Sequence, residues 1–333
     1  MANRRNGYPA PVLIAMIGVL LLIACAPAAR QQTPNKSLYN ATVVTIKEGD
    51  SLPKLAEQYL SDPSKSWIIA DFNNDDTVAA GQQIIVPLIP LGRGGLQSDG
   101  YQTVPVLRYK KFSQDQGDSS AVTRRAFEDQ LVYLKMRGYN VISLDQLLNF
   151  IEFKDQIPQK SVVITIDDSW DSFLEIAYPL LKDFQFPATL FIQTDLVGKK
   201  GALSWLDIRY LSRQGIDIQC RIKTYQTLKD LGIKQNFNQY VAALESELSR
   251  SQADIERELG KKFRYLAYPD GPVNPLLIAF AQKYGFQAGF LSTGASNPFY
   301  VGNYRVGRTM VSGDDDLEKY EKKLAVFKAV ILK

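Results

Sequence analysis

The sequence contains no histidine among its 333 residues. Histidine is the side chain that titrates near neutral pH, and it is the commonest metal ligand in proteins. Its absence excludes a Ser-His-Asp triad, a Cys-His dyad and any zinc site that is built on imidazole. Chemistry in this chain is therefore limited to carboxylates, Lys, Arg, Tyr, Ser and Cys.

Cysteine and net charge are also scarce. The two cysteines, Cys25 and Cys220, are too few for a disulfide framework. The formal net charge is only +4 and no polybasic run is present, which disfavours a nucleic-acid partner. With 45% hydrophobic and 22% charged residues, the composition is that of a globular protein, and the length allows about two domains.

The N-terminal segment has the pattern of an export signal. Residues 12–24 form an unbroken apolar run of 13 residues after two arginines, which is shorter than the roughly 20 that span a bilayer. The run ends in Leu-Ile-Ala-Cys, which resembles a bacterial lipobox, whose cysteine is acylated after cleavage in front of it. We predict a signal peptide over 1–24, a lipid on Cys25, and a small, polar tether over 25–41.

A lipid on Cys25 predicts a protein of the cell envelope that is anchored to a membrane by this lipid. Ala26 follows the cysteine where an inner-membrane retention signal has Asp, which in a Gram-negative host favours the outer membrane, facing the periplasm. An ordinary signal peptide or a short membrane anchor is the alternative.

Residues 42–88 have the pattern of a small βααβ module. Val43 to Ile46 is strand-like, Ser51 can cap a first helix, and a second strand ends at Val86-Pro87. The segment resembles a lysin motif (LysM) domain in its Gly-Asp-Ser-Leu turn, its Asn-Asn pair and its closing Gly-Gln and Val-Pro pairs. The resemblance implies binding of N-acetylglucosamine-containing glycans, such as peptidoglycan, through loops that contain Gly49, Asp50, Ser51, Leu52, Asn73, Asn74 and Asp75. A structural module without a ligand is the alternative.

Residues 89–103 are Gly-rich and polar and are predicted to be a linker. From Val104 onward, short apolar strands alternate with amphipathic helices, which indicates a parallel sheet, either open or closed into a barrel. Helices are expected over 123–137, 145–153, 173–184, 205–214, 237–259, 275–284 and 316–332. Strands are expected over 141–143, 162–168, 188–192, 216–222, 263–268 and 288–291.

Asp167 and Asp168 end the apolar strand of residues 162–168. Active sites of parallel α/β folds lie at the carboxyl ends of the strands, so this pair is the first candidate for a functional site. The alternative is that one of the two acids only caps the helix that follows.

Residues 104–325 resemble the polysaccharide deacetylases of carbohydrate esterase family 4, the NodB-homology domain. The resemblance is closest to secreted poly-N-acetylglucosamine deacetylases, and it implies a distorted (β/α)7 barrel. The segments that carry it are 104–112, 126–148, 162–192, 203–211, 216–228, 265–274 and 306–320.

The resemblance also implies roles for individual residues. Active members hydrolyse an acetamide C–N bond with a divalent metal such as zinc. Asp167 matches their general base and Asp168 their metal-binding Asp, whereas their two metal-binding histidines fall on Arg221 and Tyr225. Other motif positions are occupied by Tyr109-Lys110, by Asp270 in place of an aromatic residue, and by Gly307 in place of a late histidine, next to a retained Arg308.

Because the histidine ligands are replaced, we expect no metal cofactor and a catalytically degenerate barrel. Arg221 cannot ligate a metal, but its guanidinium can pair bidentately with Asp167 or Asp168. Trp170 closely follows Asp167 and Asp168, in the loop that faces the site. It is expected to line the pocket with Tyr225, Asp270 and Arg308. Two alternatives stay open: an oxygen-rich Mg²⁺ or Ca²⁺ site of Asp167, Asp168 and Asp270, and Cys220 as a ligand or nucleophile.

The predicted function is that of a binding or scaffold lipoprotein that holds N-acetylglucosamine-containing glycan, with envelope proteins as a second class of partner. The alternative is an active N-deacetylase of peptidoglycan or another polysaccharide that works through an unconventional site.

Overall fold

The computed structural model describes residues 41–73, 75, 77–88, 95–97, 99–115, 119–167, 169–223, 237–271 and 273–330. The predicted signal peptide, Cys25 and the tether up to residue 40 lie outside these residues, as do Asn74, Asp168 and Tyr225. Among the helices of the described residues, none combines the length and the apolar character that a membrane crossing requires.

The first described segment folds around a small core of its own. Its elements are β1 (Ala41–Thr45), α1 (Leu52–Leu60), a 3-10 turn (Pro63–Lys65), α2 (Ser66–Asn73) and β2 (Gln83–Pro87). The two strands pair antiparallel, with Val43 opposite Ile85. Strand β1 thus already includes Ala41, the last residue of the predicted tether. The core of the segment consists of Ile46, Leu52, Leu55, Ala56, Ile69, Ala70, Ile84 and Val86.

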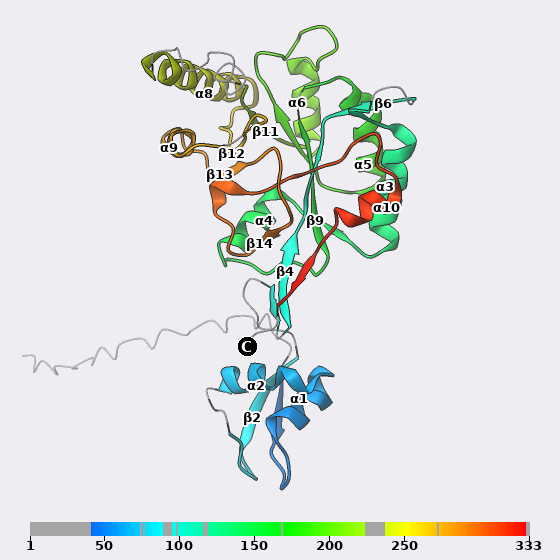
Figure 1. Ribbon diagram of the computed structural model, residues 1–333, viewed down its shortest axis with the longest axis vertical. Coiled ribbons are helices and arrows are strands. Elements are labelled where there is room, and N and C mark those ends of the chain that lie inside the picture. The colour runs from blue at the N-terminus through cyan, green and yellow to red at the C-terminus, as the bar shows by residue number, and fades with distance from the viewer. Residues whose placement is uncertain are drawn as a thin grey trace, which may run out of the picture. The chain divides into compact units, whose positions relative to one another are not determined.

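The described residues from 95 onward form a larger region, which is built on a curled parallel sheet (Figure 1). Seven strands follow one another in the order β13-β12-β11-β10-β9-β5-β15, and β8 pairs with β9 beside this path. A parallel bridge from Phe290 to Val306 links the β13 edge to the segment that leads into β15 at the other edge. The strands are β5 (Val106–Tyr109), β8 (Asn140–Val141), β9 (Ser161–Asp167), β10 (Thr189–Ile192), β11 (Asp217–Arg221), β12 (Tyr265–Ala267), β13 (Ala288–Phe290) and β15 (Thr309–Met310).

The central strand β9 shows why this sequence forms a parallel sheet. All seven of its residues are buried, and it pairs in parallel with β5 on one side and β10 on the other. Successive side chains point to opposite faces of a strand, so Ile164 belongs to the main core cluster whereas its neighbour Val163 belongs to a second one. A run of Val and Ile that is interrupted only by Thr165 therefore suits a strand that is covered on both faces.

Helices cover this sheet. Helices α5 and α10 both contact α3, while α8 contacts both α6 and α9 on another flank (Figure 1). The capping boxes of Ser143 with Gln146 and of Ser204 with Asp207 fix the starts of α4 and α6. The helices are α3 (Arg124–Met136), α4 (Leu144–Ile151), α5 (Tyr178–Phe184), α6 (Trp205–Arg213), α8 (Phe237–Leu259), α9 (Pro275–Lys283) and α10 (Leu317–Lys322). The α/β class of the prediction is confirmed.

Two predicted boundaries are wrong, and both errors have the same cause. The expected helix over 316–332 ends at Lys322, and the chain continues into a strand, β16 (Phe327–Ala329). Its antiparallel partner is β4 (Gly100–Val104), which lies mostly within the predicted linker and also pairs with β3 (Leu96–Gln97). Such pairing joins segments that are far apart in the sequence, whereas local hydrophobic periodicity reports only near neighbours.

The predicted helix over 173–184 is divided in two. It starts with a π-helical turn, Phe173–Ala177, and α5 follows, with Pro179 in its first turn. Proline is tolerated there because the first N–H groups of a helix have no partner within the helix.

Candidate functional site

Asp167 lies fully buried at the carboxyl end of β9 and is surrounded by three arginines. Arg308 contacts both carboxylate oxygens, with Nη1 2.5 Å from Oδ1 and Nη2 3.1 Å from Oδ2. Arg108 Nε lies 2.6 Å and Arg221 Nε 3.2 Å from Oδ2. Because β5, β9, β11 and the segment before β15 belong to one parallel sheet, their ends bring these side chains to one place. We call Arg108, Arg221 and Arg308 with Asp167 the arginine cluster.

Asp270 lies at the solvent side of the arginine cluster, with 53% of its side chain exposed. Its Oδ1 accepts a hydrogen bond of 2.8 Å from Arg108 Nη1, and its Oδ2 is 3.9 Å from Arg221 Nη2. The same Arg108 nitrogen also donates to the backbone carbonyl of Ser292 at 3.0 Å. Three guanidinium groups thus face two carboxylates among the described residues, and the buried charges are largely compensated.

The three arginines determine the protonation of Asp167. Burial alone would raise the pKa of its carboxyl, but Arg308, Arg221 and Arg108 together hold that pKa well below its usual range. Burial also tends to raise the pKa of Asp270, and the hydrogen bond and charge of Arg108 outweigh it, so this pKa is lowered too. Both carboxylates are therefore ionised at neutral pH.

This arrangement is poorly suited to general base catalysis. A general base works best when its pKa lies near the operating pH and when a lone pair can reach the proton that is transferred. Asp167 has a lowered pKa, has no exposed surface, and has both oxygens in contact with guanidinium groups. Its proton affinity and its accessibility are both low.

The described residues also do not fit a metal centre. A divalent cation beside Asp167 would meet three guanidinium groups within hydrogen-bonding or ion-pair distance of the same carboxylate. Among the described residues, no three His, Cys, Asp or Glu side chains are grouped so that they could hold a metal ion.

Of the predicted pocket residues, Arg221, Asp270 and Arg308 do meet around Asp167. For Asp167, the predicted bidentate contact of Arg221 is wrong, because Arg221 approaches Asp167 through Nε and the bidentate partner is Arg308. Asp168, the other partner that was considered, lies outside the described residues. The ring centroid of the half-buried Trp170 lies 5.4 Å from Lys111 Nζ, and its place in the pocket stays a prediction.

Arg108 is the member of the arginine cluster that was not predicted. It lies in a strand of four residues that are all buried, and its own side chain is 1% exposed. An arginine amid the apolar residues of a short strand is the signal that could have identified it. A buried cation of this kind requires a buried carboxylate as its partner.

The two alternative chemistries meet obstacles in the structure. The Mg²⁺ or Ca²⁺ site required Arg221 to point away, whereas Arg221 faces both Asp167 and Asp270. Cys220 lies in the main core cluster, and burial raises the pKa of its thiol far above the usual range. The thiol therefore stays protonated and inaccessible, which disfavours Cys220 as a nucleophile or ligand.

Gly307, the position of a histidine in the resemblance, lies in a close approach of two backbone segments. A Cβ atom at this position would lie 3.0 Å from the carbonyl oxygen of Ala295 and 3.2 Å from Cα of Gly294. The side chain of Asn297 fixes the approach, since it accepts from the Gly307 N–H at 2.7 Å and donates to the Gly307 carbonyl at 2.9 Å. Glycine at this position lets the backbone bring Arg308 to Asp167.

The first predicted glycan-binding loop is a tight turn in front of α1. Gly49 adopts a positive φ of 83°, and Asp50 Oδ2 accepts a hydrogen bond of 2.8 Å from the backbone N–H of Lys47. Ser51 caps α1, and Leu52 is buried in the core of the segment. These residues shape the turn, and their contact with sugar stays a prediction.

In the second predicted loop, polar side chains bind the backbone of their own segment. Asn73 donates to the carbonyl of Ile85 at 2.7 Å and accepts from its N–H at 2.8 Å, which joins α2 to β2. Asp75 accepts from the N–H of Thr77 at 3.0 Å and from Gln82 at 3.3 Å, and these bonds lower its pKa. Any contact of this loop with sugar likewise stays a prediction.

Comparison with solved structures defines the class of fold. A Streptococcus pyogenes deacetylase, PplD in complex with acetate, has a TM-score of 0.58 and 20% identity, and the match covers 68% of this chain and 99% of that one. IcaB from Ammonifex degensii also has a TM-score of 0.58, with 23% identity over 69% of this chain and 98% of its own. The curled α/β sheet is thus the fold of these deacetylases.

Sequence comparison then identifies the family. The polysaccharide deacetylase family model matches residues 154–289. A poly-β-1,6-N-acetyl-D-glucosamine N-deacetylase of Staphylococcus epidermidis is 30% identical over 207 residues, which cover 58% of this chain and 69% of that protein. The Staphylococcus aureus protein of the same name is 26% identical, over 58% of this chain and 69% of its own length. The chain belongs to the polysaccharide deacetylase family.

Proposed function

We propose that this chain is a cell-envelope lipoprotein that binds N-acetylglucosamine-containing glycan and whose deacetylase-like region is catalytically degenerate. The observation that carries the proposal is the state of Asp167, which is fully buried and contacted by three arginines. The resemblance implies that this residue is the general base, and here its lone pairs are directed at guanidinium groups.

The arginine cluster offers a physical reason why the region folds without a metal. A buried carboxylate that lacks a partner is strongly destabilising, and in metal-dependent relatives a cation can be that partner. In this chain the positive charge comes from side chains, which form charge-assisted hydrogen bonds with the carboxylate. The absence of histidine from the whole sequence agrees with this replacement.

Two observations support glycan as the binding partner in this proposal. Curated relatives are named poly-β-1,6-N-acetyl-D-glucosamine N-deacetylases, which suggests a glycan of N-acetylglucosamine. The βααβ segment over 41–87, with its resemblance to a LysM domain, would supply a separate contact with such chains. Lipid attachment at Cys25 would hold both parts at a membrane of the cell envelope.

The test of the proposal measures the release of acetate and the metal content of the same protein. Purified protein is incubated with β-1,6-linked N-acetylglucosamine oligomers, released acetate is quantified, and bound metal is determined by elemental analysis. We expect no acetate above the blank and less than one metal ion per ten chains. Acetate release that depends on stoichiometric zinc, cobalt or nickel would overturn the proposal of a catalytically degenerate region. It would favour the alternative, an active N-deacetylase.

Asp167→Asn decides whether any measured activity belongs to this site. The substitution removes the carboxylate and nearly keeps its shape. If wild type released acetate and the variant did not, Asp167 would be a working catalytic residue and the proposal would be wrong. If trace activity were equal in both proteins, it would come from a contaminant.

A further inference from the structure

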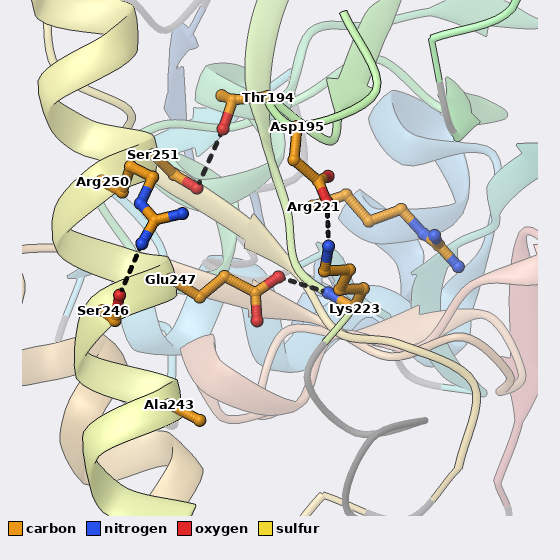
Figure 2. A pocket seen from close by; sticks show the side chains of 9 residues that line it. All are labelled: Thr194, Asp195, Arg221, Lys223, Ala243, Ser246, Glu247, Arg250 and Ser251. Carbon is orange, nitrogen blue, oxygen red and sulfur yellow. Dashed lines mark hydrogen bonds and ion pairs between the residues drawn. The ribbon is translucent and has the colours of Figure 1, made fainter. Parts of the chain in front are cut away.

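A small pocket opens beside the arginine cluster, between α8 and the chain that follows β10 and β11 (Figure 2). Its volume is about 280 Å³, close to the lower end of the roughly 300–1,000 Å³ that small-molecule sites occupy. Arg221 belongs to its wall, but its guanidinium points away from the other labelled side chains (Figure 2), consistent with its contact to Asp167. The pocket is therefore next to the arginine cluster but has a polar lining of its own.

Hydrogen-bond donors and acceptors alternate around this pocket. Lys223 forms an ion pair with Asp195, and its backbone N–H donates to Glu247 Oε1 at 2.7 Å. On α8, Arg250 Nη2 donates to Ser246 Oγ at 3.0 Å. The hydroxyl groups of Thr194 and Ser251 lie 3.4 Å apart, and Ser251 is next to Arg250 on α8 (Figure 2).

The charges of the lining exclude several ligand classes. An anion would approach Asp195 and Glu247, and a cation would approach Lys223 and Arg250, so neither gains from the pocket as a whole. An apolar ligand would bury these polar groups without hydrogen bonds, which is costly. A neutral ligand with many hydroxyl groups fits best, because each hydroxyl both donates and accepts.

We propose that this pocket is a saccharide subsite that holds one neutral hexose or N-acetylhexosamine unit of a glycan chain. The inference rests on the proposed function, since it places one part of the glycan in the deacetylase-like region. Arg250 and Lys223 donate to ring hydroxyl or acetamide oxygens, while Glu247 and Asp195 accept from hydroxyl groups.

The experiment is isothermal titration calorimetry of the full chain with β-1,6-linked N-acetylglucosamine oligomers. We expect two binding events per chain for wild type, one from the LysM-like segment and one from this pocket. Ala243→Leu places a larger side chain in the pocket and suits a helix, and it should abolish one event. Arg250→Ala should weaken the same event by about two- to tenfold, the effect of one hydrogen bond.

The matched control is Arg257→Ala, on the same helix but outside the pocket lining, where the exposed Arg257 forms ion pairs with Asp254 and Glu258. It should leave both events unchanged. If Ala243→Leu and Arg250→Ala keep the stoichiometry and affinities of wild type, the pocket is not a subsite, although the proposed function stands. If wild type binds no oligomer at all, the proposed glycan binding falls, and this inference falls with it.

Charged oligomers test the ligand class. Hexuronic acid oligomers and fully deacetylated glucosamine oligomers should each bind the pocket at least fivefold more weakly than the neutral oligomer. Stronger binding of either charged probe, lost in Ala243→Leu, would overturn the assignment to a neutral sugar.

Discussion

Two Arg–Asp assemblies of the larger region differ in burial and in the number of arginines that contact the carboxylate. At the carboxyl ends, Asp167 and Arg308 are both fully buried. At the amino end of β12, Arg264 Nη2 contacts both oxygens of Asp145, at 2.7 and 2.8 Å, but these side chains are 43% and 51% exposed. Contacts of similar length should therefore have different energies, because water solvates one assembly and not the other.

The largest expected effect separates these two assemblies directly. Asp167→Ala leaves three inward-facing guanidinium groups without their shared carboxylate and should lower the free energy of unfolding by about 3–5 kcal/mol. Asp145→Ala removes an exposed ion pair and the acceptor of the Tyr265 hydroxyl, and it should cost only about 1–2 kcal/mol. Urea unfolding followed by circular dichroism measures both. Equal losses would show that burial does not distinguish the two assemblies.

A second prediction concerns how the backbone positions Arg308. Gly307→Ala puts a Cβ atom 3.0 Å from the Ala295 carbonyl oxygen and should cost about 1–3 kcal/mol of stability. Gly302→Ala is the control, because a Cβ atom there meets nothing within 4 Å. Thermal unfolding of the two variants provides the comparison, and equal melting temperatures would show that the close approach at residue 307 relaxes freely.

Acid titration should reveal the buried carboxylate through its pH dependence. The folded-state pKa of Asp167 lies below the unfolded value of about 3.9, so its stabilisation is fully present above the unfolded pKa. As the pH falls below about 4, the unfolded state takes up the proton first, and each unit of lowering corresponds to about 1.4 kcal/mol lost. Asp167→Asn should flatten the stability profile between pH 4 and 2, relative to wild type. A profile unchanged by this substitution would contradict the prediction.

The smallest expected effect is that of salt on the exposed assembly. At 1 M NaCl the screening length is about 3 Å, so the stability difference between wild type and Asp145→Ala should shrink to the part that comes from the hydrogen bond of Tyr265. The difference between wild type and Asp167→Ala should persist, because buried charges are screened far less. Unfolding curves at low and high salt provide the measurement, and a salt-sensitive Asp167 effect would place that carboxylate in contact with solvent.

Much of the fold could be predicted from local pattern. The strand around Asp167 and the helix over 237–259 follow from an apolar run and from helical spacing, which are properties of neighbouring residues. Pairing partners could not be predicted in this way. The antiparallel contact of Phe327 with Gln102 depends on how the whole chain folds back.

Only part of the candidate site could be predicted from the sequence. Asp167, Arg221, Asp270 and Arg308 could be selected because they fall on motif positions of a family. Arg108 matches none of the motif positions considered, and its role depends on the register that places it beside Thr165 of β9, two residues before Asp167. Which guanidinium makes the bidentate contact is a question of side-chain geometry, on which residue spacing gives no information.

The pairing of β16 with β4 has a consequence for the order of folding. Strand β4 can pair with β16 only after the residues up to Ala329 have been synthesised, because Gly100 pairs with Ala329. Contacts of such long sequence separation require loop closure that is entropically costly, and they slow folding. A chain that emerges during synthesis would therefore leave an edge of β4 without this partner until β16 has appeared, which would delay completion of the fold.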